Sequence, residues 1–180
     1  MIKLICAHQD IDPVFECVSI DEAVKYLSEQ TVLGVDTETS GKCFTSKKVV
    51  MFQIGTKEVQ YVIDTRFIGI EPLIPILENP NIVKIFHNIK FDYKFLKAQW
   101  GSDIKNPYDT MLAEGAINWG KLKVGYSLNA LTQRYLGKEL NKEVRNKFVG
   151  LDGNPFNTEQ ILYGAEDVVH LLEDTPVSKN

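Results

Sequence analysis

The first third of the chain consists of short apolar runs separated by polar turns, a pattern that predicts β-strands. The clearest run, Val32-Leu33-Gly34-Val35, is rich in β-branched residues and leads toward a turn at Ser40-Gly41. Two later runs, residues 48–56 and 59–64, flank Lys57-Glu58 and predict a hairpin. With the strand that starts at Val32 they predict an antiparallel meander. Shorter strands are predicted at residues 2–6 and 14–17.

After Arg66 the apolar residues take a helical period, interrupted by one further strand at residues 82–86. Ser19 and Glu22 fit a capping box and predict a helix over residues 19–30. The other predicted helices cover residues 71–78, 89–100, 109–117, 127–136 and 158–173. Four apolar residues of the last helix have the spacing of a core-facing stripe: Leu162, Ala165, Val169 and Leu172. The pattern therefore predicts one α/β domain over residues 1–180, with a mixed five-stranded sheet flanked by helices.

The composition is that of a folded protein, since 44% of the residues are hydrophobic and 24% are charged. No apolar run approaches the ~20 residues that span a membrane, and the first residues lack the pattern of a signal peptide. Cys6, Cys17 and Cys43 have neither CxxC spacing nor a nearby histidine cluster. We therefore expect reduced thiols in a cytoplasmic protein without a membrane partner.

The net charge of −4 is unevenly distributed. Residues 121–147 carry a net charge of +5, from seven basic residues (Lys121, Lys123, Arg134, Lys138, Lys142, Arg145, Lys147) and two acidic ones (Glu139, Glu143). A local positive stripe of this kind can bind phosphates. A solvated helix-loop face explains it equally simply, and charge alone favours that second interpretation.

Two carboxylates, Asp36 and Glu38, follow the apolar run at Val32 and lie two residues apart. Because side chains alternate along a strand, both are expected on the same side of the sheet. Two acids held together are costly unless a cation lies between them. A divalent metal such as Mg²⁺, which takes oxygen ligands, is the candidate.

Two further acids occur beside apolar segments later in the chain. Asp92 falls in the first turn of the helix over residues 89–100, for which Asn88 is the predicted N-cap. Tyr163 and Asp167 are four residues apart in the last helix and therefore share a face. Asp109 is either an acid near the site or the N-cap of the helix that follows it, and the cap is the simpler interpretation.

These residues form three ordered motifs, Asp-x-Glu (Asp36, Glu38), Asn-x-x-x-Asp (Asn88, Asp92) and Tyr-x-x-x-Asp (Tyr163, Asp167). The motifs resemble those of the DEDD 3′-5′ exonuclease superfamily, and the tyrosine matches its DEDDy branch. The resemblance covers roughly residues 19–172. Four flanking stretches resemble the proofreading domain of family A DNA polymerases: residues 32–41, 87–96, 108–112 and 126–137.

The resemblance implies an RNase H-like fold and phosphodiester hydrolysis with two divalent ions, Mg²⁺ or Mn²⁺. Such ions, ~3.5–4 Å apart, stabilise the attacking and leaving oxygens together. It further implies that Asp36 bridges both metals, that Glu38 and Asp167 complete the first site, and that Asp92 holds the second. Tyr163 would position the attacking water, so all five residues are expected to be catalytic.

By the same resemblance, Asn88 helps to place the substrate near its 3′ end, and Thr37, between the two strand acids, is assigned to substrate binding. Phe44, in the loop after Glu38, is a candidate for stacking on a terminal base, although an aromatic that anchors its loop is the simpler interpretation.

Three functions are compatible with these motifs. The leading expectation is a metal-dependent 3′-5′ exonuclease that releases nucleoside 5′-monophosphates from single-stranded DNA, either alone or with a polymerase partner or domain. The alternative is a ribonuclease D-like exoribonuclease, because residues 53–56 and 158–167 resemble that branch at least as well. A non-catalytic binding module is the third, since a fold alone does not guarantee chemistry. No pattern in the sequence decides whether a 2′-hydroxyl is accepted.

Overall fold

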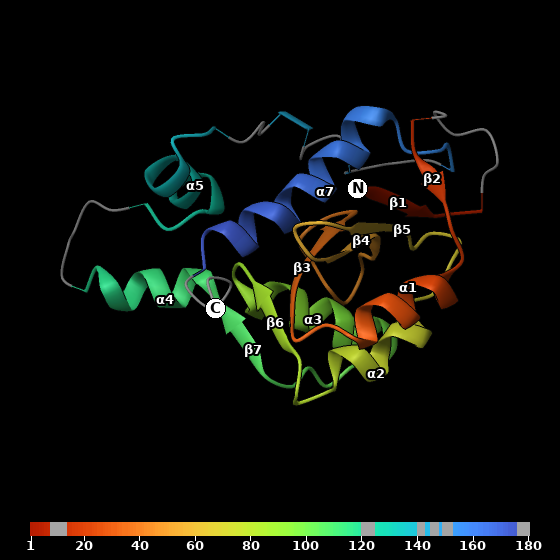
Figure 1. The fold of residues 1–180 in the computed structure, drawn as a ribbon, viewed down its shortest axis with the longest axis horizontal. Helices are drawn as coiled ribbons and strands as arrows, with labels where there is room; N and C mark the ends of the chain where they lie inside the picture. The colour runs from red at the N-terminus through yellow and green to blue at the C-terminus, as the bar shows by residue number, and fades with distance from the viewer. Residues whose placement is uncertain (8–13, 120–124, 140–142, 145–147, 149–152, 176–180) are drawn as a thin grey trace.

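The computed structural model describes residues 1–7, 14–119, 125–139, 143–144, 148 and 153–175. Its centre is a seven-stranded mixed sheet with the order β2-β1-β5-β4-β3-β6-β7 (Figure 1). The strands are β1 (Ile2–Ile5), β2 (Glu16–Cys17), β3 (Val32–Thr39), β4 (Val49–Gly55), β5 (Gln60–Asp64), β6 (Val83–Phe86) and β7 (Pro107–Asp109).

The predicted α/β class is confirmed, but the sheet has seven strands instead of five. Its two edge strands are short: β2 has two residues and β7 has three. β2 lies within the strand predicted at residues 14–17, whereas β7 was not predicted, because three residues are too few to show a period of two. They exist because each pairs in parallel with a longer strand, β2 with β1 and β7 with β6.

The predicted meander is confirmed, since β3 pairs with β4 and β4 with β5, both antiparallel. Asp36 lies opposite Gln53 in this register, and Glu38 lies opposite Met51. The pairing shifts by one position between Glu38 and Thr39, which marks a β-bulge at the end of β3. The acid-bearing end of β3 is therefore also the end where regular pairing stops.

The helices agree closely with the apolar periodicity. They are α1 (Ile20–Ser28), α2 (Ile74–Leu77), α3 (Ile89–Trp100), α4 (Thr110–Ile117), α5 (Leu128–Leu136) and α7 (Thr158–Glu173). The predicted helix over residues 71–78 is instead a 3₁₀ turn, η1 (Glu71–Leu73), followed by one short α-helical segment, α2. Pro72 and Pro75 explain the difference, because neither can donate a backbone hydrogen bond.

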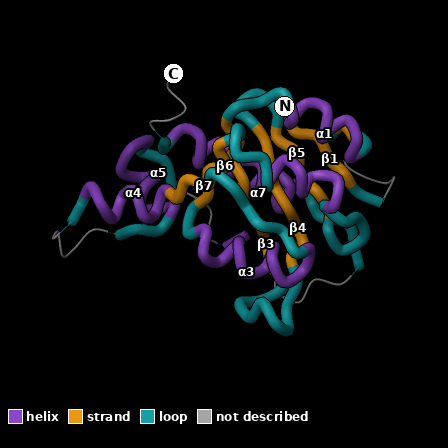
Figure 2. The backbone as a smooth tube through the Cα atoms, turned by 90° about the horizontal axis from the view of Figure 1, so that it is seen from below, coloured by secondary structure: helices purple, strands orange, loops and turns teal. Residues whose placement is uncertain are grey.

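Helices cover both faces of the sheet. Helix α7 packs on β3, β4, β5 and β6, whereas α1, α2 and α3 bury their apolar residues with Leu33 and Val35 of β3 on the opposite face. Figure 2 shows α4 and α5 beside β6 and β7, at one end of the sheet. The alternation along β3 therefore directs Gly34, Asp36 and Glu38 toward α7.

The core stripe predicted for α7 is wrong at two positions, Leu162 and Val169, and Val169 is only half-buried. Leu162 is 39% exposed, and the neighbouring Ile161 is buried in its place, together with Ala165, Val168 and Leu172. The error is a shift of one residue around the helix, which arises because apolar residues cover a wide arc of α7. None of the described helices is long and apolar enough to cross a membrane.

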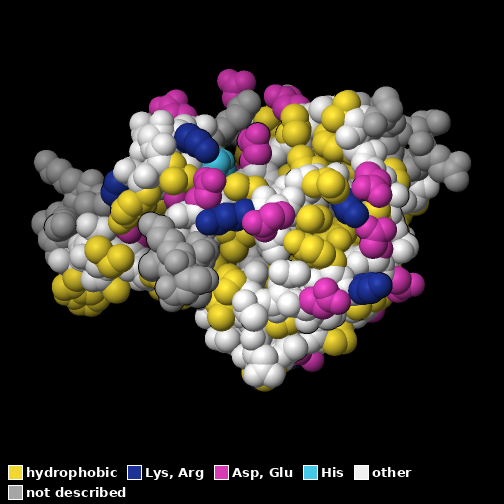
Figure 3. Space-filling view, viewed as in Figure 1, with side chains coloured by type: hydrophobic (Ala, Val, Ile, Leu, Met, Phe, Trp, Pro, Cys, Tyr) yellow, Lys and Arg dark blue, Asp and Glu magenta, His cyan; other side chains and the backbone are white. Residues whose placement is uncertain are grey.

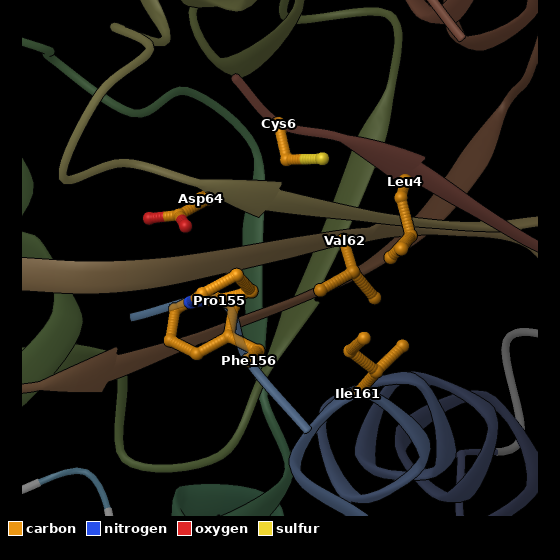
Figure 4. A pocket seen from close by; sticks show the side chains of 7 residues that line it. All are labelled: Leu4, Cys6, Val62, Asp64, Pro155, Phe156 and Ile161. Carbon is orange, nitrogen blue, oxygen red and sulfur yellow. The ribbon is translucent and has the colours of Figure 1, made fainter. Parts of the chain in front are cut away.

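A small cavity of about 20 Å³ lies between β1, β5 and the segment that leads into α7 (Figure 4). Among the described residues, Cys6 and Asp64 are its polar lining groups. Arg66 binds both carboxylate oxygens of Asp64, donates to the Asn154 carbonyl and lies 4.2 Å from the centre of the Phe156 ring. This cluster holds the entry to α7 on the sheet and is structural.

Candidate active site

Three predicted metal ligands meet between β3 and α7. Asp36, Glu38 and Asp167 each offer a carboxylate oxygen, and these oxygens all lie within 4.8 Å of one another. Glu38 and Asp167 are buried, with 7% and 4% of their surface exposed. Asp36 and Glu38 face α7 because strand side chains alternate, and one turn of α7 separates Asp167 from Tyr163. The structure thus brings together acids that are 131 residues apart in sequence.

Two glycines allow α7 to approach the sheet closely enough for this contact. A Cβ atom on Gly34 would lie 2.9 Å from the carbonyl oxygen of Val168. A Cβ atom on Gly164 would lie 2.7 Å from Nε2 of Gln53 and 2.9 Å from Sδ of Met51. This role cannot be predicted from the sequence, because it depends on which strand lies beneath the helix.

Asp92, the fourth predicted ligand, approaches from the opposite face of the sheet. It lies in the first turn of α3, as predicted, and is only 3% exposed. Its Oδ1 accepts a 2.6 Å hydrogen bond from the hydroxyl of Thr37, which lies between the two acids of β3. It does not belong to the group of three oxygens within 4.8 Å.

The pKa of Asp92 is raised well above its usual range. Burial is the main cause, and the negative charge of Asp36 is the second, while the hydrogen bond from Thr37 lowers the pKa. A buried carboxylate whose charged form is disfavoured by another carboxylate lies in a site with excess negative charge. A bound cation would remove that excess.

The donor set fits the predicted metal. Carboxylate oxygens are hard ligands that suit Mg²⁺ and Mn²⁺. Asp36, Glu38 and Asp167 converge from two elements, and Asp92 feels the charge of Asp36. The acidic site therefore has the chemistry of a divalent-metal centre.

Tyr163 lies half-buried on α7, one turn before Asp167. Its ring is 6.2 Å from the ring of Phe148, at an angle of 40°. Phe148 is fully buried and also contacts Phe156. The base of the Tyr163 side chain is thus packed in an aromatic cluster that restricts the positions of its phenol group.

The prediction that the Asn88 side chain caps α3 is wrong. Asn88 occupies the N-cap position with a φ of 61°, and its side chain makes no capping hydrogen bond. Asp109 provides the cap instead, since its carboxylate accepts hydrogen bonds from the backbone N–H groups of Asn88 and Ile89. The same carboxylate accepts from Met111 and Leu112, so the predicted cap of α4 is confirmed.

The three predicted substrate-binding residues lie in two places. Asn88 and Phe44 line one open groove of about 440 Å³. Thr37 lies outside it, is only 6% exposed and donates to Asp92. A contact between Thr37 and a substrate stays a prediction, whereas its contact with Asp92 is a feature of the structure.

Gln53 is a buried residue beside the acids, and no sequence motif marked it as part of the site. It lies opposite Asp36 on β4 and is fully buried, yet neither its Oε1 nor its Nε2 has a hydrogen-bond partner among the described residues. Only the strand register places it there. The amide therefore adds an unsatisfied donor and acceptor to the polar environment under α7.

Most of the basic stretch lies outside the described residues, including Lys121, Lys123, Lys142, Arg145 and Lys147. Arg134, one of its described members, forms an ion pair with the buried Glu114 and donates to the Gly125 carbonyl. Arg134 thus links α5 to α4 by structural contacts.

Residues 11–175 match the sequence model of the 3′-5′ exonuclease family. The chain belongs to this family of nucleases. The resemblance inferred from the three motifs is confirmed.

Two curated relatives show how the match extends. Ribonuclease D of Gluconacetobacter diazotrophicus is 27% identical over 164 residues, which cover 89% of this chain and 40% of that protein. Exosome complex component 10 of Mus musculus is 29% identical over 161 residues, which cover 86% of this chain and 17% of that protein. The chain thus spans less than half the length of these relatives.

Solved structures share the fold. The Nibbler EXO domain of Aedes aegypti gives a TM-score of 0.77 at 19% identity, over 96% of this chain and 84% of that one. A Trypanosoma brucei RNase D complex with RNA U12 gives a TM-score of 0.74 at 20% identity, over 86% of this chain and 57% of that one. Brucella melitensis NrnC with bound Mg²⁺ gives a TM-score of 0.70 at 18% identity, over 99% of this chain and 79% of that one. These neighbours confirm the expected RNase H-like fold.

Proposed function

We propose that the chain is a divalent-metal-dependent 3′-5′ exoribonuclease that removes nucleoside 5′-monophosphates one at a time from single-stranded RNA. The observation that carries the proposal is the convergence of Asp36, Glu38 and Asp167 on a fold of the 3′-5′ exonuclease family. The relatives that share the sequence over most of its length carry the names ribonuclease D and exosome component.

RNA replaces single-stranded DNA as the leading substrate because of these relatives. They support the ribonuclease D-like alternative better than a DNA substrate, a role in proofreading or replication, or a polymerase partner. A structural neighbour with bound RNA supports the same choice. The non-catalytic module is disfavoured, since all four acids and the tyrosine of the motifs are present.

In this proposal Asp36, Glu38 and Asp167 hold one divalent ion and Asp92, with Asp36, holds the second. When bound, the ions lower the pKa of water and offset negative charge on the scissile phosphate. Thr37 fixes the Asp92 carboxylate through its 2.6 Å hydrogen bond. Tyr163, supported by Phe148, orients the attacking water, and Asn88 holds the 3′-terminal nucleotide.

The test is a time course with RNA and DNA oligonucleotides of the same sequence, each labelled at the 5′ end, in Mg²⁺, Mn²⁺ or EDTA. We expect a ladder that shortens from the 3′ end of the RNA in either metal and is absent in EDTA. Asp36→Ala should abolish it. Asp21→Ala, which removes an exposed acid of α1, is the matched control and should cleave like the wild type.

Three outcomes would contradict the proposal. A ladder that persists in Asp36→Ala would come from a contaminating nuclease. Faster shortening of DNA than of RNA would restore the DNA substrate. Absence of shortening for both substrates in both metals would leave the binding module as the remaining function.

A further inference from the structure

Gln53 lies beside the acidic site but is not one of its motif residues. It faces the same side of the sheet as Asp36, because the two residues are directly opposite each other in the antiparallel pair of β3 and β4. The Cβ atoms of such a pair are about 4.5–5.5 Å apart. The side-chain amide of Gln53 is therefore within reach of the carboxylate of Asp36, the ligand that both proposed ions share.

The amide of Gln53 is buried at a cost. The residue is fully buried, and neither Oε1 nor Nε2 has a hydrogen-bond partner among the described residues. A buried donor or acceptor without a partner destabilises a fold, and most buried side-chain polar atoms in proteins have one. An apolar side chain of the same size would avoid this cost. Packing alone therefore does not explain a glutamine at this position.

The side chains around the amide provide one strong acceptor for it. Gln53 lies between Asp36 on β3 and Val62 on β5. Helix α7 covers it at Gly164, where an added Cβ atom would lie 2.7 Å from Nε2 of Gln53. Met51, two residues away on the same face of β4, has a sulfur that accepts only weakly. Among these neighbours, the Asp36 carboxylate is thus the group that can bond the amide well.

We propose that Gln53 is a positioning residue of the active site, whose Nε2 donates a hydrogen bond to the Asp36 carboxylate in the metal-loaded protein and fixes its orientation. The inference rests on the proposed function and adds a residue to it. Because the side chain of Gln53 makes no hydrogen bond in the structure, the contact needs a rotation of the amide, and the last torsion of glutamine is soft. Carboxylates that bind metals are commonly oriented by hydrogen bonds of this kind.

A second buried glutamine provides a matched control. Gln60 on β5 is 4% exposed, and its Nε2 donates hydrogen bonds of 2.7 and 2.8 Å to the carbonyl groups of Thr56 and Lys57. β5 pairs with β4 but not with β3, which carries Asp36. Gln60 therefore stabilises the turn between β4 and β5, a structural role that the Gln53 side chain does not have.

The test compares Gln53→Met with Gln60→Met, since methionine keeps the length of the side chain and removes the amide. The Tm is measured in EDTA, and Mn²⁺ binding is measured without RNA by electron paramagnetic resonance of the free ion. Gln53→Met removes two unsatisfied polar atoms and should melt at or above the wild-type temperature. It should bind Mn²⁺ about 10- to 100-fold more weakly. Gln60→Met should show the opposite result, a lower Tm with the Mn²⁺ affinity of the wild type.

Kinetics distinguish positioning of a ligand from binding of the substrate. Gln53 is fully buried, so its replacement should not remove a contact with RNA. At a fixed Mg²⁺ concentration, Gln53→Met should lower kcat by about 10- to 100-fold and leave the KM for the labelled RNA unchanged. Gln60→Met should keep both constants at a temperature where it is fully folded.

A measurement on the wild type does not depend on the folding of a variant. The side-chain amides of Gln53 and Gln60 are followed in ¹⁵N–¹H NMR spectra while Mg²⁺ is added. One N–H proton of Gln53 should move to lower field as the hydrogen bond to Asp36 forms. The amide of Gln60, which already has its hydrogen bonds, should keep its position.

These results separate the role of Gln53 from the proposed function. Wild-type Mn²⁺ affinity and kcat in Gln53→Met, or an amide resonance that Mg²⁺ does not move, would overturn the positioning role. A lower Tm in EDTA with wild-type Mn²⁺ affinity would show that Gln53 is structural, like Gln60. If Mn²⁺ binding depends on Gln53 but the wild type does not hydrolyse RNA, the proposed function fails and the positioning role stands.

Discussion

The hydroxyl of Thr37 donates a 2.6 Å hydrogen bond to Oδ1 of Asp92, which connects the acid-bearing strand to the helix on the opposite face of the sheet. Thr37 points to α3 because its neighbours Asp36 and Glu38 point to α7. Residues 36–38 of β3 thus contact acids on both sides of the sheet. The position of Asp92 relative to the other acids depends on this contact.

Replacing Thr37 by valine keeps the shape of the side chain and removes the hydroxyl. A hydrogen bond to a charged group contributes about 1.5–3 kcal/mol, so Thr37→Val should lower the free energy of unfolding by about that much in urea titrations. Loss of a residue that orients a metal ligand commonly costs 10- to 100-fold in activity or metal affinity. Thr37→Ser retains the donor and should behave nearly like the wild type. Equal activity of both variants would show that the bond does not position Asp92.

Asp92 should also make the stability of the metal-free protein depend on pH. Its pKa is raised by burial and by Asp36, so the native state binds a proton more tightly than the unfolded state. The contribution of Asp92 to the free energy of unfolding is therefore fully present below its unfolded-state pKa of about 3.9. It is lost as the pH rises through the native-state pKa. Asp92→Asn removes the charge and should raise the Tm in EDTA at neutral pH, by about 2–4 °C for each kcal/mol gained.

A metal titration checks the same residue in the opposite direction. Mn²⁺ should raise the Tm of the wild type, because a ligand that binds only the native state stabilises it. The rise should be smaller in Asp92→Asn. If Asp92→Asn lowered the Tm in EDTA and kept the full response to Mn²⁺, Asp92 would be neither a costly buried charge nor a metal ligand.

A buried lysine gives the reverse pH dependence. Lys84 on β6 is fully buried and donates a 2.6 Å hydrogen bond to the Asn79 carbonyl. Burial lowers its pKa to about 8. Between pH 8 and about 10.5 the unfolded state binds more protons, so stability should rise with pH in that window and be reduced below it.

At pH 7, Lys84→Met should therefore unfold at a higher urea concentration than the wild type. Its free energy of unfolding should be greater by about 1–3 kcal/mol. Loss of the hydrogen bond to the Asn79 carbonyl, which keeps a 3.3 Å hydrogen bond from the Ile82 N–H, will offset part of this gain. The variant should also lose the rise in stability above pH 8. Lys57→Met, at an exposed lysine, is the control and should retain that rise. A variant less stable than the wild type at pH 7 would show that the hydrogen bond outweighs the burial cost.

The sequence was sufficient wherever one chain segment determines its own geometry. The alternation along β3 placed Asp36 and Glu38 on one side, and the helical period placed Tyr163 and Asp167 together. The long strands could be predicted because each is a run of apolar residues, and the helices because their apolar residues recur with the helical period. In each case the signal lies within a few residues of the feature that it predicts.

Features that depend on tertiary neighbours could not be found in this way. Gln53 lies beside the acids only because β4 pairs with β3 in one register. Gly164 is required because α7 crosses β4 at that residue. Leu112 and Ile117 of α4 are exposed, although the apolar pattern alone would bury them. Figure 3 shows hydrophobic side chains gathered at the lower left, where Figure 1 places α4.

Asp109 shows the same dependence and provides the last prediction. It ends β7, opposite Phe86 of β6, and this pairing brings its carboxylate to the start of α3 as well as α4. Loss of an N-cap costs about 1 kcal/mol, so Asp109→Ala should lower the free energy of unfolding by about 2 kcal/mol. Asp109→Asn keeps one acceptor oxygen and should lose about half as much. Because α3 carries Asp92 and is preceded by Asn88, nuclease activity should fall in the same order. If Asp109→Ala lowered the free energy of unfolding by only the amount of a single cap, one of the two helices would not depend on Asp109.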